Sequence, residues 1–190
     1  MRPGHFGLMG LALLLGATDL LVKGLGLAMT ALPVLLLFGV ALPALRRHLD
    51  RAGYWLGVLL LSALLASLAS LLLQAGAFEL HRALGPYLYL LVLPCLQLAA
   101  SDSTDALDGL GAGLAFALLA ALLGALREVL GHASLFAHFD WLLGPLALGW
   151  RLQFGADGIP LFAVAPGAFI LLGTLLALWR RLTTRTADSR

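Results

Sequence analysis

The one cysteine of the chain, Cys95, carries the side chain with the widest chemical scope. A cysteine thiolate binds transition metals and iron–sulfur clusters. Cys95 follows Pro94 directly, and a proline removes one backbone hydrogen bond from a helix. Irregular backbone at membrane depth is tolerated only where protein or a cavity covers it. The residue is therefore a candidate metal or iron–sulfur ligand, with a buried small apolar side chain as the alternative.

Two pairs of opposite charges lie near the ends of apolar segments. Asp19 and Lys23 are four residues apart, so on a helix they share a face and can form an ion pair. Arg127 and Glu128 are adjacent, so on a helix they point about 100° apart and need separate partners, in loops or in a neighbouring subunit. Gly131 then offers a predicted C-terminal cap. Each charge is either an intramembrane functional residue or an ordinary interface residue.

A third group of polar residues lies in the run GHASLFAHFD, where His132, His138 and Asp140 are potential metal ligands. The alternative is a pair of ordinary histidines on an external loop at the membrane interface. Elsewhere the sequence carries no phosphate-binding glycine loop with its lysine, no GxSxG and no HExxH motif. The signatures of self-contained soluble enzymes are therefore missing.

Composition shows which elements must position these residues. Of the 190 residues, 61% are hydrophobic and 12% are charged, whereas a soluble domain has about 45–50% apolar and 25% charged residues. So little charge cannot cover a water-facing surface, and the sequence predicts an all-α, polytopic membrane protein. The positive residues behind the net charge of +2 lie at segment ends. They indicate topology rather than nucleic-acid binding.

Six apolar segments approach the length of about 20 residues that crosses a bilayer. They predict one transmembrane domain over residues 1–182, with a polar cytoplasmic tail at 183–190 and spans at 6–22, 24–45, 54–78, 84–100, 107–130 and 159–179. The first is interpreted as a retained helix rather than a signal peptide. The first span is short and interrupted by Gly16 and Asp19, and the fourth is short and interrupted at its prolines. Their matching positions predict two inverted three-helix repeats around a midplane site.

Positive charges and glycines predict orientation and packing. Gly109, Gly113 and Gly124 in the fifth segment permit close helix contact. We expect a helix–helix seam there, which is also the candidate contact with partner chains; a cofactor seam is the lesser alternative. Lysine and arginine are more frequent on one side of the membrane, which predicts cytoplasmic termini. That side receives Arg2, Arg46, Arg47, Arg51, Arg180, Arg181, Arg185 and Arg190, and the other receives Lys23, Arg82 and Arg151.

Four runs occur along most of the chain in a characteristic order: GLGLAMT (24–30), LGPYLYLLVLPC (84–95), ALDGLGAGLAFALLAALLGALREVLGHASLF (106–136) and LFAVAPGAFILLGTLLAL (161–178). Together they resemble the small six-helix subunits of the Rnf and Na⁺-translocating NADH:quinone reductase complexes. The similarity is greatest to the RnfE/NqrD branch. The LREVLG and PGAFI motifs are the most specific parts of this resemblance.

The resemblance implies a non-autonomous subunit of an ion-translocating electron-transport complex, a translocase, in the bacterial inner membrane. It implies a homologous membrane partner of opposite topology, RnfA/NqrE-like, and further subunits that carry flavin and iron–sulfur centres. A [2Fe–2S] cluster would lie between the two homologous subunits, each donating two cysteines from interrupted helices. Electron passage would be coupled to Na⁺ or H⁺ movement. Cys95 matches the second of the two ligand cysteines.

The first ligand cysteine of that family has no counterpart here. The matching run is GLMG, with Met9 or Gly10 at that place. A glycine has no donor atom, and a thioether is a poor substitute for a thiolate on iron. Three alternatives follow: a partner or unusual ligand completes the cluster, the chain is a divergent paralogue without it, or the protein is non-redox. The last would be a membrane protein such as the substrate-binding subunit of a small-molecule, vitamin-type importer.

Overall fold

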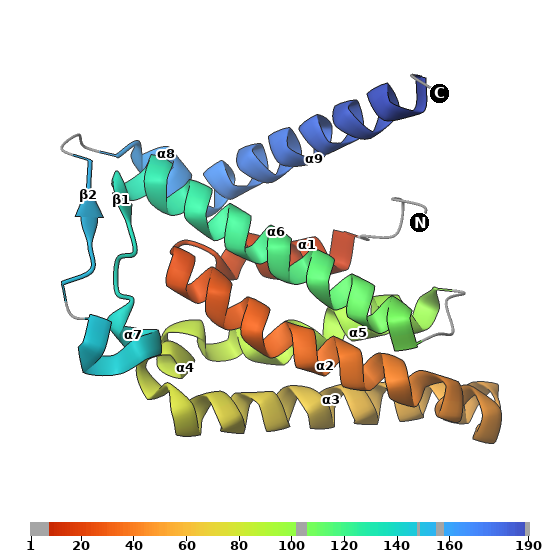
Figure 1. The fold of residues 1–190 in the computed structure, drawn as a ribbon. Coiled ribbons are helices and arrows are strands. Elements are labelled where there is room, and N and C mark those ends of the chain that lie inside the picture. Colours follow the sequence, from red (N-terminus) through yellow and green to blue (C-terminus); the bar gives the residue numbers. More distant parts are fainter. Residues whose placement is uncertain (1–7, 102–105, 148, 155–157, 189–190) are drawn as a thin grey trace.

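The structure is a computed structural model, and it describes residues 8–101, 106–147, 149–154 and 158–188. These residues are mostly helical (Figure 1). Among them, four stretches are long and apolar enough to cross a membrane: Leu21–His48, Arg51–Gly76, Phe78–Ala100 and Leu107–His132. A shorter apolar helix covers Ala165–Leu178. A multi-pass membrane protein follows from these helices, whereas six spans, inverted repeats and cytoplasmic termini stay predictions.

Helix α1 (Leu8–Ala17) and helix α2 (Leu21–His48) are separated by a break at residues 18–20. The Thr18 hydroxyl donates a 2.6 Å hydrogen bond to the Leu14 carbonyl oxygen, which offers the backbone an alternative to continuing the helix. The first predicted span, 6–22, is interrupted at Asp19 as expected, but its two parts belong to different helices. Its helix ends at Ala17, and the last residues of that span and Lys23 belong to α2. Residues 6 and 7 lie outside the described part.

Helix α3 (Arg51–Gly76) leads into the fourth predicted segment, which consists of three short helices: α4 (Phe78–Leu84), the 3₁₀ helix η1 (Gly85–Leu91) and α5 (Val92–Ala100). Gly85 has a φ of +48°, a conformation that favours glycine. The interruption therefore lies at Gly85 and along η1. Pro94 falls in the first turn of α5 instead, where the missing backbone N–H costs the helix little.

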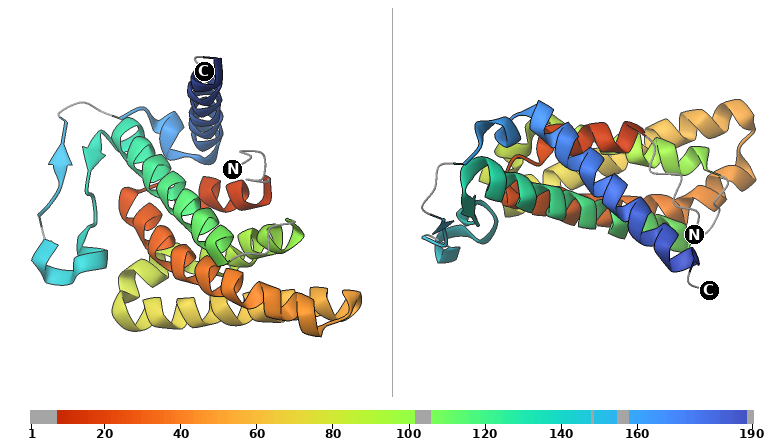
Figure 2. Two further views of the ribbon diagram at one scale, coloured as in Figure 1. Left: turned by 45° about the vertical axis from the view of Figure 1, so that its right-hand side comes forward. Right: turned by 90° about the horizontal axis from the view of Figure 1, so that it is seen from above.

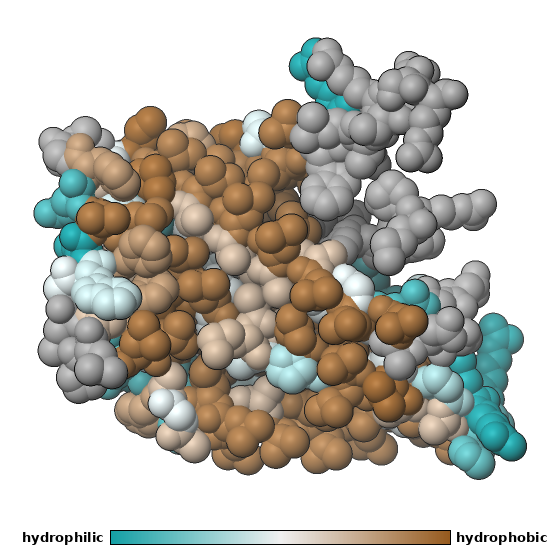
Figure 3. All heavy atoms as spheres, viewed as in Figure 1, coloured by the Kyte–Doolittle hydropathy of each residue, from teal (hydrophilic) through white to brown (hydrophobic). Residues whose placement is uncertain are grey.

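Helix α2 and helix α6 (Ala106–His132) form the centre of the bundle and lie side by side in both views (Figures 1 and 2). They run antiparallel, because Gly24 of α2 meets Ala120 of α6 whereas Leu35 of α2 meets Gly109. Their largest buried side chains include Phe38 and Phe116. The outer leucines of α3, such as Leu60 and Leu72, are exposed. Apolar residues dominate the face in Figure 3, with hydrophilic residues mainly towards its ends, as a lipid-facing surface requires.

The chain after α6 forms a small unit beyond the ends of the long helices (Figure 1). It contains strand β1 (Ser134–Leu135), helix α7 (Asp140–Leu143), the 3₁₀ helix η2 (Gly144–Ala147) and strand β2 (Leu152–Gln153). The two strands are antiparallel, with Ser134 opposite Gln153. Helix α8 (Pro160–Ala163) and helix α9 (Ala165–Asp188) follow. Figure 2 shows α9 diverging from the bundle, so much of its length lies apart from the other helices.

Candidate site where two short helices meet

The short helices α1 and α5 pack against each other beside Cys95. Gly10 of α1 is buried, and a Cβ atom there would lie 3.9 Å from Pro94 Cβ and 3.4 Å from Gln97 Oε1. Gly10 is one candidate for the missing ligand position. The structure places it against Pro94, the residue that directly precedes Cys95. Met9 is also part of α1, but its side chain lies outside the described residues.

The Cys95 side chain is 0% exposed and belongs to the main apolar core. Within the described part of the chain, no three histidine, cysteine, aspartate or glutamate side chains gather in an arrangement that could hold a metal ion. The thiol is thus covered by this chain itself. In the isolated subunit it occupies the position of a packed apolar side chain.

The donor atoms around Cys95 decide whether a [2Fe–2S] cluster fits. Such clusters are normally held by four thiolates, and the whole sequence contains one cysteine. Gly10 leaves space for the Cβ of a small side chain in ordinary contact with α5, yet it supplies no ligand. The residues present therefore do not fit a cluster that takes two thiolates from this chain.

Arg127 lies near the end of α6, is 2% exposed, and binds the ends of two other helices. Its Nη1 donates to the carbonyl oxygen of Leu15 in α1 at 3.0 Å. Its Nε and Nη2 donate to the carbonyl oxygens of Phe162 and Ala163 in α8, at 3.2 and 2.9 Å. The last carbonyl groups of a helix have no partner within it and carry partial negative charge. A buried guanidinium, with five N–H donors, satisfies several of them at once.

Glu128 is 0% exposed and binds two backbone amides that do not interact with Arg127. Its Oε2 accepts a 2.8 Å hydrogen bond from the Leu21 N–H, at the start of α2. Its Oε1 accepts a 2.6 Å hydrogen bond from the Ala137 N–H. A carboxylate suits the positive end of a helix. Arg127 and Glu128 thus have the separate loop and helix-end partners that their adjacent positions require. Arg127 binds the end of α1 and Glu128 binds the start of α2, so together they hold both sides of the break between these helices.

Arg46 of α2 has similar contacts at the opposite end of the bundle. Its Nη2 donates to the carbonyl oxygens of Ala99 and Ser101, at 3.1 and 2.7 Å, where α5 ends. Its Nε donates to the Tyr54 hydroxyl at 3.3 Å, and that hydroxyl donates to Ala99 at 2.9 Å. From the sequence, Arg46 was used only to predict the orientation of the chain in the membrane. Nothing local marks this role, because its backbone partners lie more than 50 residues along the chain.

Asp19 and Lys23 form the ion pair that their spacing predicts, with 2.8 Å between Asp19 Oδ2 and Lys23 Nζ. Asp19 lies in the break rather than on a helix. Its other carboxylate oxygen is buried and has no hydrogen-bond partner among the described residues. Both side chains remain partly exposed, so the pair borders the buried network of Arg127 and Glu128 instead of joining it.

The glycines of α6 form a seam inside the subunit. A Cβ atom at Gly109 would lie 2.7 Å from the Leu35 carbonyl oxygen, and one at Gly113 would lie 3.4 Å from Leu32 Cα. One at Gly124 would lie 3.0 Å from the Leu20 carbonyl oxygen. These glycines therefore face α2 and its start. The expectation that this face contacts a partner chain is corrected, because α2 of the same chain already covers it.

The predicted cap at Gly131 is also corrected. Helix α6 continues to His132, and the residue in the left-handed conformation is Ala133, with a φ of +46°. Gly131 instead permits close backbone packing, because a Cβ atom there would lie 2.8 Å from the Ala163 backbone nitrogen. The absent side chain lets α8 approach the end of α6, where Arg127 binds it.

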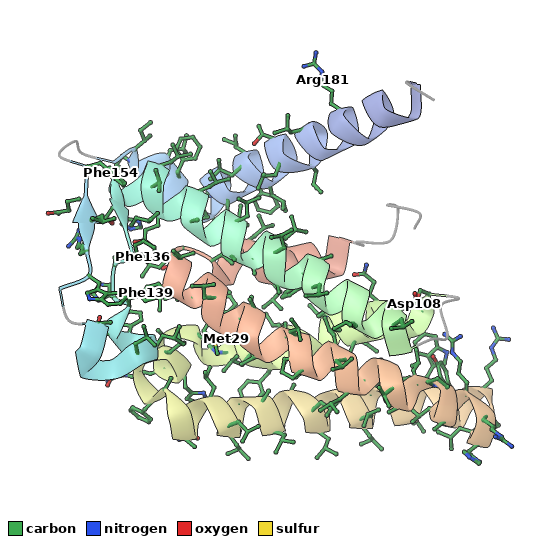
Figure 4. All side chains as sticks on the ribbon, viewed as in Figure 1. Met29, Asp108, Phe136, Phe139, Phe154 and Arg181 are labelled. Carbon is green, nitrogen blue, oxygen red and sulfur yellow. The ribbon has the colours of Figure 1, made fainter. Side chains whose placement is uncertain are left out.

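The polar residues of the end unit do not meet as three ligands within the described part of the chain. His138 stacks on Trp141, with ring centroids 4.5 Å apart. Beside it, Phe136 and Phe139 (Figure 4) pack edge to face with centroids 5.0 Å apart. His138 and Asp140 line a shallow hollow of about 250 Å³, but His132 is not among its lining residues. The arrangement indicates an aromatic cluster rather than a metal centre.

Comparison with known proteins gives a consistent result over nearly the whole chain. A family model described as "Rnf-Nqr subunit, membrane protein" matches residues 3–176. The chain is 35% identical to the E-type subunit of the ion-translocating oxidoreductase complex of Pseudomonas paraeruginosa, over 98% of this chain and 82% of the relative. Proteins with the same description from Shewanella sp. (strain ANA-3) and Rhodobacter capsulatus are 34% and 33% identical. These matches cover 93% and 90% of this chain, and 81% and 74% of those relatives.

Proposed function

The chain belongs to the Rnf-Nqr family of membrane subunits, and we propose that it works as the E-type subunit of an ion-translocating oxidoreductase complex. The observation that carries the proposal is the match over residues 3–176. That range includes both short helices, the break between α1 and α2, and the four long apolar stretches. The family match also argues against the alternative of a vitamin-type importer subunit.

The proposal includes partner chains. Apart from the small unit between α6 and α8, the described residues form helices, so the described part of the chain has little soluble mass that could bind flavin or nucleotide by itself. We propose a homologous membrane subunit of opposite topology and further subunits with flavin and iron–sulfur centres, assembled in the bacterial inner membrane. Because α2 already covers the glycine seam of α6, the partner is expected on another face. The exposed side of α9, which includes Phe169, Ile170 and Leu178, is one apolar surface that this contact could use.

For the redox step we propose that this chain contributes at most one thiolate, Cys95, to an iron–sulfur centre whose other ligands come from partner subunits. Two features support a site at this place: the meeting of α1 and α5, and the contact of Gly10 with the turn that carries Cys95. Full burial of the thiol within this chain favours a second candidate. In that case the chain is a divergent subunit that keeps the helix frame of the complex without binding the cluster.

Iron analysis of the assembled complex separates these two candidates. The proposal expects that Cys95→Ser lowers the iron and acid-labile sulfide per complex and removes a reducible paramagnetic signal, while the subunits still co-purify. Cys95→Ala provides a matched control for packing. If both variants keep the iron content and electron transfer of the unchanged complex, Cys95 is a core residue and the divergent-subunit candidate holds.

Membrane vesicles test the function as a whole. Deleting the gene should abolish both the oxidoreductase activity of the complex and the Na⁺ or H⁺ uptake coupled to it, and the intact chain should restore both. We propose coupling to one of these two ions, and uptake measured in sodium-free buffer distinguishes them. Oxidoreductase activity and ion uptake that are unchanged in the deletion strain would contradict the proposed function.

A further inference from the structure

The two central helices, α2 and α6, each carry a basic side chain that binds the carboxyl end of a short helix. Arg127 of α6 binds the end of α1 through Leu15. Arg46 of α2 binds the end of α5 through Ala99. In the chain, α1 directly precedes α2 and α5 directly precedes α6. Each long helix therefore holds the short helix that belongs to the other one.

These contacts lie at opposite ends of the bundle. The break after α1 is at one end of the antiparallel α2–α6 pair, and the carboxyl end of α5 is at the other (Figure 1). Between them, α1 and α5 meet at Gly10 and Pro94. The place where the short helices meet is thus fixed from both ends, in each case by a guanidinium group.

Arginine suits this role for a physical reason. The carboxyl end of a helix presents carbonyl oxygens without intrahelical partners, and burying such an oxygen without a hydrogen-bond partner costs free energy. A guanidinium group offers five donors in a rigid plane and retains its charge, whereas a lysine ammonium is a smaller, strongly hydrated group. Arg127 uses three nitrogen atoms for three carbonyl groups, and Arg46 uses two nitrogen atoms for two carbonyl groups and the Tyr54 hydroxyl.

We infer that Arg46 and Arg127 are a matched pair of positioning residues that together set the contact between α1 and α5 beside Cys95. Each arginine couples the two halves of the chain, because each binds a short helix of the other half: Arg127 binds Leu15 of α1, and Arg46 binds Ala99 of α5. Glu128 strengthens one end by binding the first amide of α2. The inference concerns the geometry of this chain alone, so it does not depend on the proposed redox function.

Disulfide formation measures this geometry directly. In a Cys95→Ser background, Gly10→Cys with Pro94→Cys places two Cβ atoms 3.9 Å apart, within the range of a disulfide bond. A second pair, Gly113→Cys with Leu35→Cys, places two Cβ atoms 3.6 Å apart across the α2–α6 seam. Both pairs are oxidised in native membranes, in the full chain within its complex. The fraction of cross-linked chain is then read by mass spectrometry after thiol alkylation.

The expected result is specific to the short helices. Arg127→Met and Arg46→Met should each slow disulfide formation in the α1–α5 pair about tenfold, the effect of losing a charge-assisted hydrogen bond, and should leave the α2–α6 pair unchanged. Lysine at either position should restore part of the rate. Arg47→Met is the matched control, because Arg47 is an exposed neighbour of Arg46, and it should change neither pair.

Two results would overturn the inference. If neither methionine variant slows the α1–α5 pair, the arginines do not set this contact. If a methionine variant slows both cysteine pairs equally, that arginine supports the general stability of the bundle rather than the position of a short helix. The cross-linking rates depend on neither electron transfer nor ion uptake, so a failure of the proposed function leaves the test intact.

Discussion

Replacing Gly109 with alanine should destabilise the chain, whereas the same change at Gly111 should not. At Gly109 the added Cβ atom would lie 2.7 Å from the Leu35 carbonyl oxygen and 2.9 Å from Gly39 Cα. Both neighbours are backbone atoms of α2, so they can move away only if the helices separate. At Gly111, two residues further along α6, the added atom would meet nothing within 4 Å.

The comparison removes the contribution that the two substitutions share. Glycine to alanine stabilises a helix by about 0.5–1 kcal/mol at either position. Overpacking at a closed contact costs about 1–3 kcal/mol, and only Gly109 has such a contact. The free energies of unfolding of the two variants should therefore differ by about 1–3 kcal/mol, with Gly109→Ala the less stable.

Equilibrium unfolding of the purified chain in mixed micelles, followed by circular dichroism as the denaturing detergent increases, measures this difference. Both variants share one helix, one type of substitution and one added methyl group. Equal unfolding free energies would show that α2 and α6 do not approach at Gly109, and would refute the assignment of the seam to the inside of the subunit.

Other contacts and the topology give three further predictions. Glu128→Ala leaves two amides without their acceptor and should lower the free energy of unfolding by about 2–6 kcal/mol. Glu128→Gln keeps one acceptor oxygen and should lower it by about half as much. Equal losses in thermal unfolding would contradict the role of Glu128 in binding both amides. Because Asp19 and Lys23 are partly exposed, Lys23→Met should change stability by about 1 kcal/mol or less, and a loss of several kcal/mol would place the pair in the buried network. Reporter fusions after Arg190 and within residues 139–155 should lie on opposite sides of the membrane, and a result on one side would contradict the predicted topology.

The long helices could be predicted from the sequence because their signal is local. Runs of apolar residues near bilayer length mark α2, α3 and α6 to within a few residues. The end of α1 could be predicted only approximately, because Gly16 and Asp19 mark an interruption in the first span but hydropathy continues to Val22 and does not place the helix end at Ala17. The actual break depends on the Thr18 side chain and on Glu128, which binds the Leu21 amide from 107 residues away.

The candidate site was predictable only in part, for the same reason. The adjacency of Arg127 and Glu128 shows that they need separate partners, but it does not identify those partners. Glycines in α6 indicate a close approach, but the sequence does not say whether the other backbone belongs to this chain. Arg46 carried no local signal at all, because its role depends on where α5 ends in space.

Purification of the tagged chain from native membranes tests the central claim most directly. We predict that mild detergent extracts it with the other subunits of an ion-translocating oxidoreductase complex, in fixed stoichiometry, with the bound flavin and iron of those subunits and with oxidoreductase activity. Mass spectrometry of the intact assembly gives both the composition and the copy number of this chain. Recovery of the chain alone, or with proteins unrelated to electron transport while the rest of the complex purifies complete without it, would contradict the account.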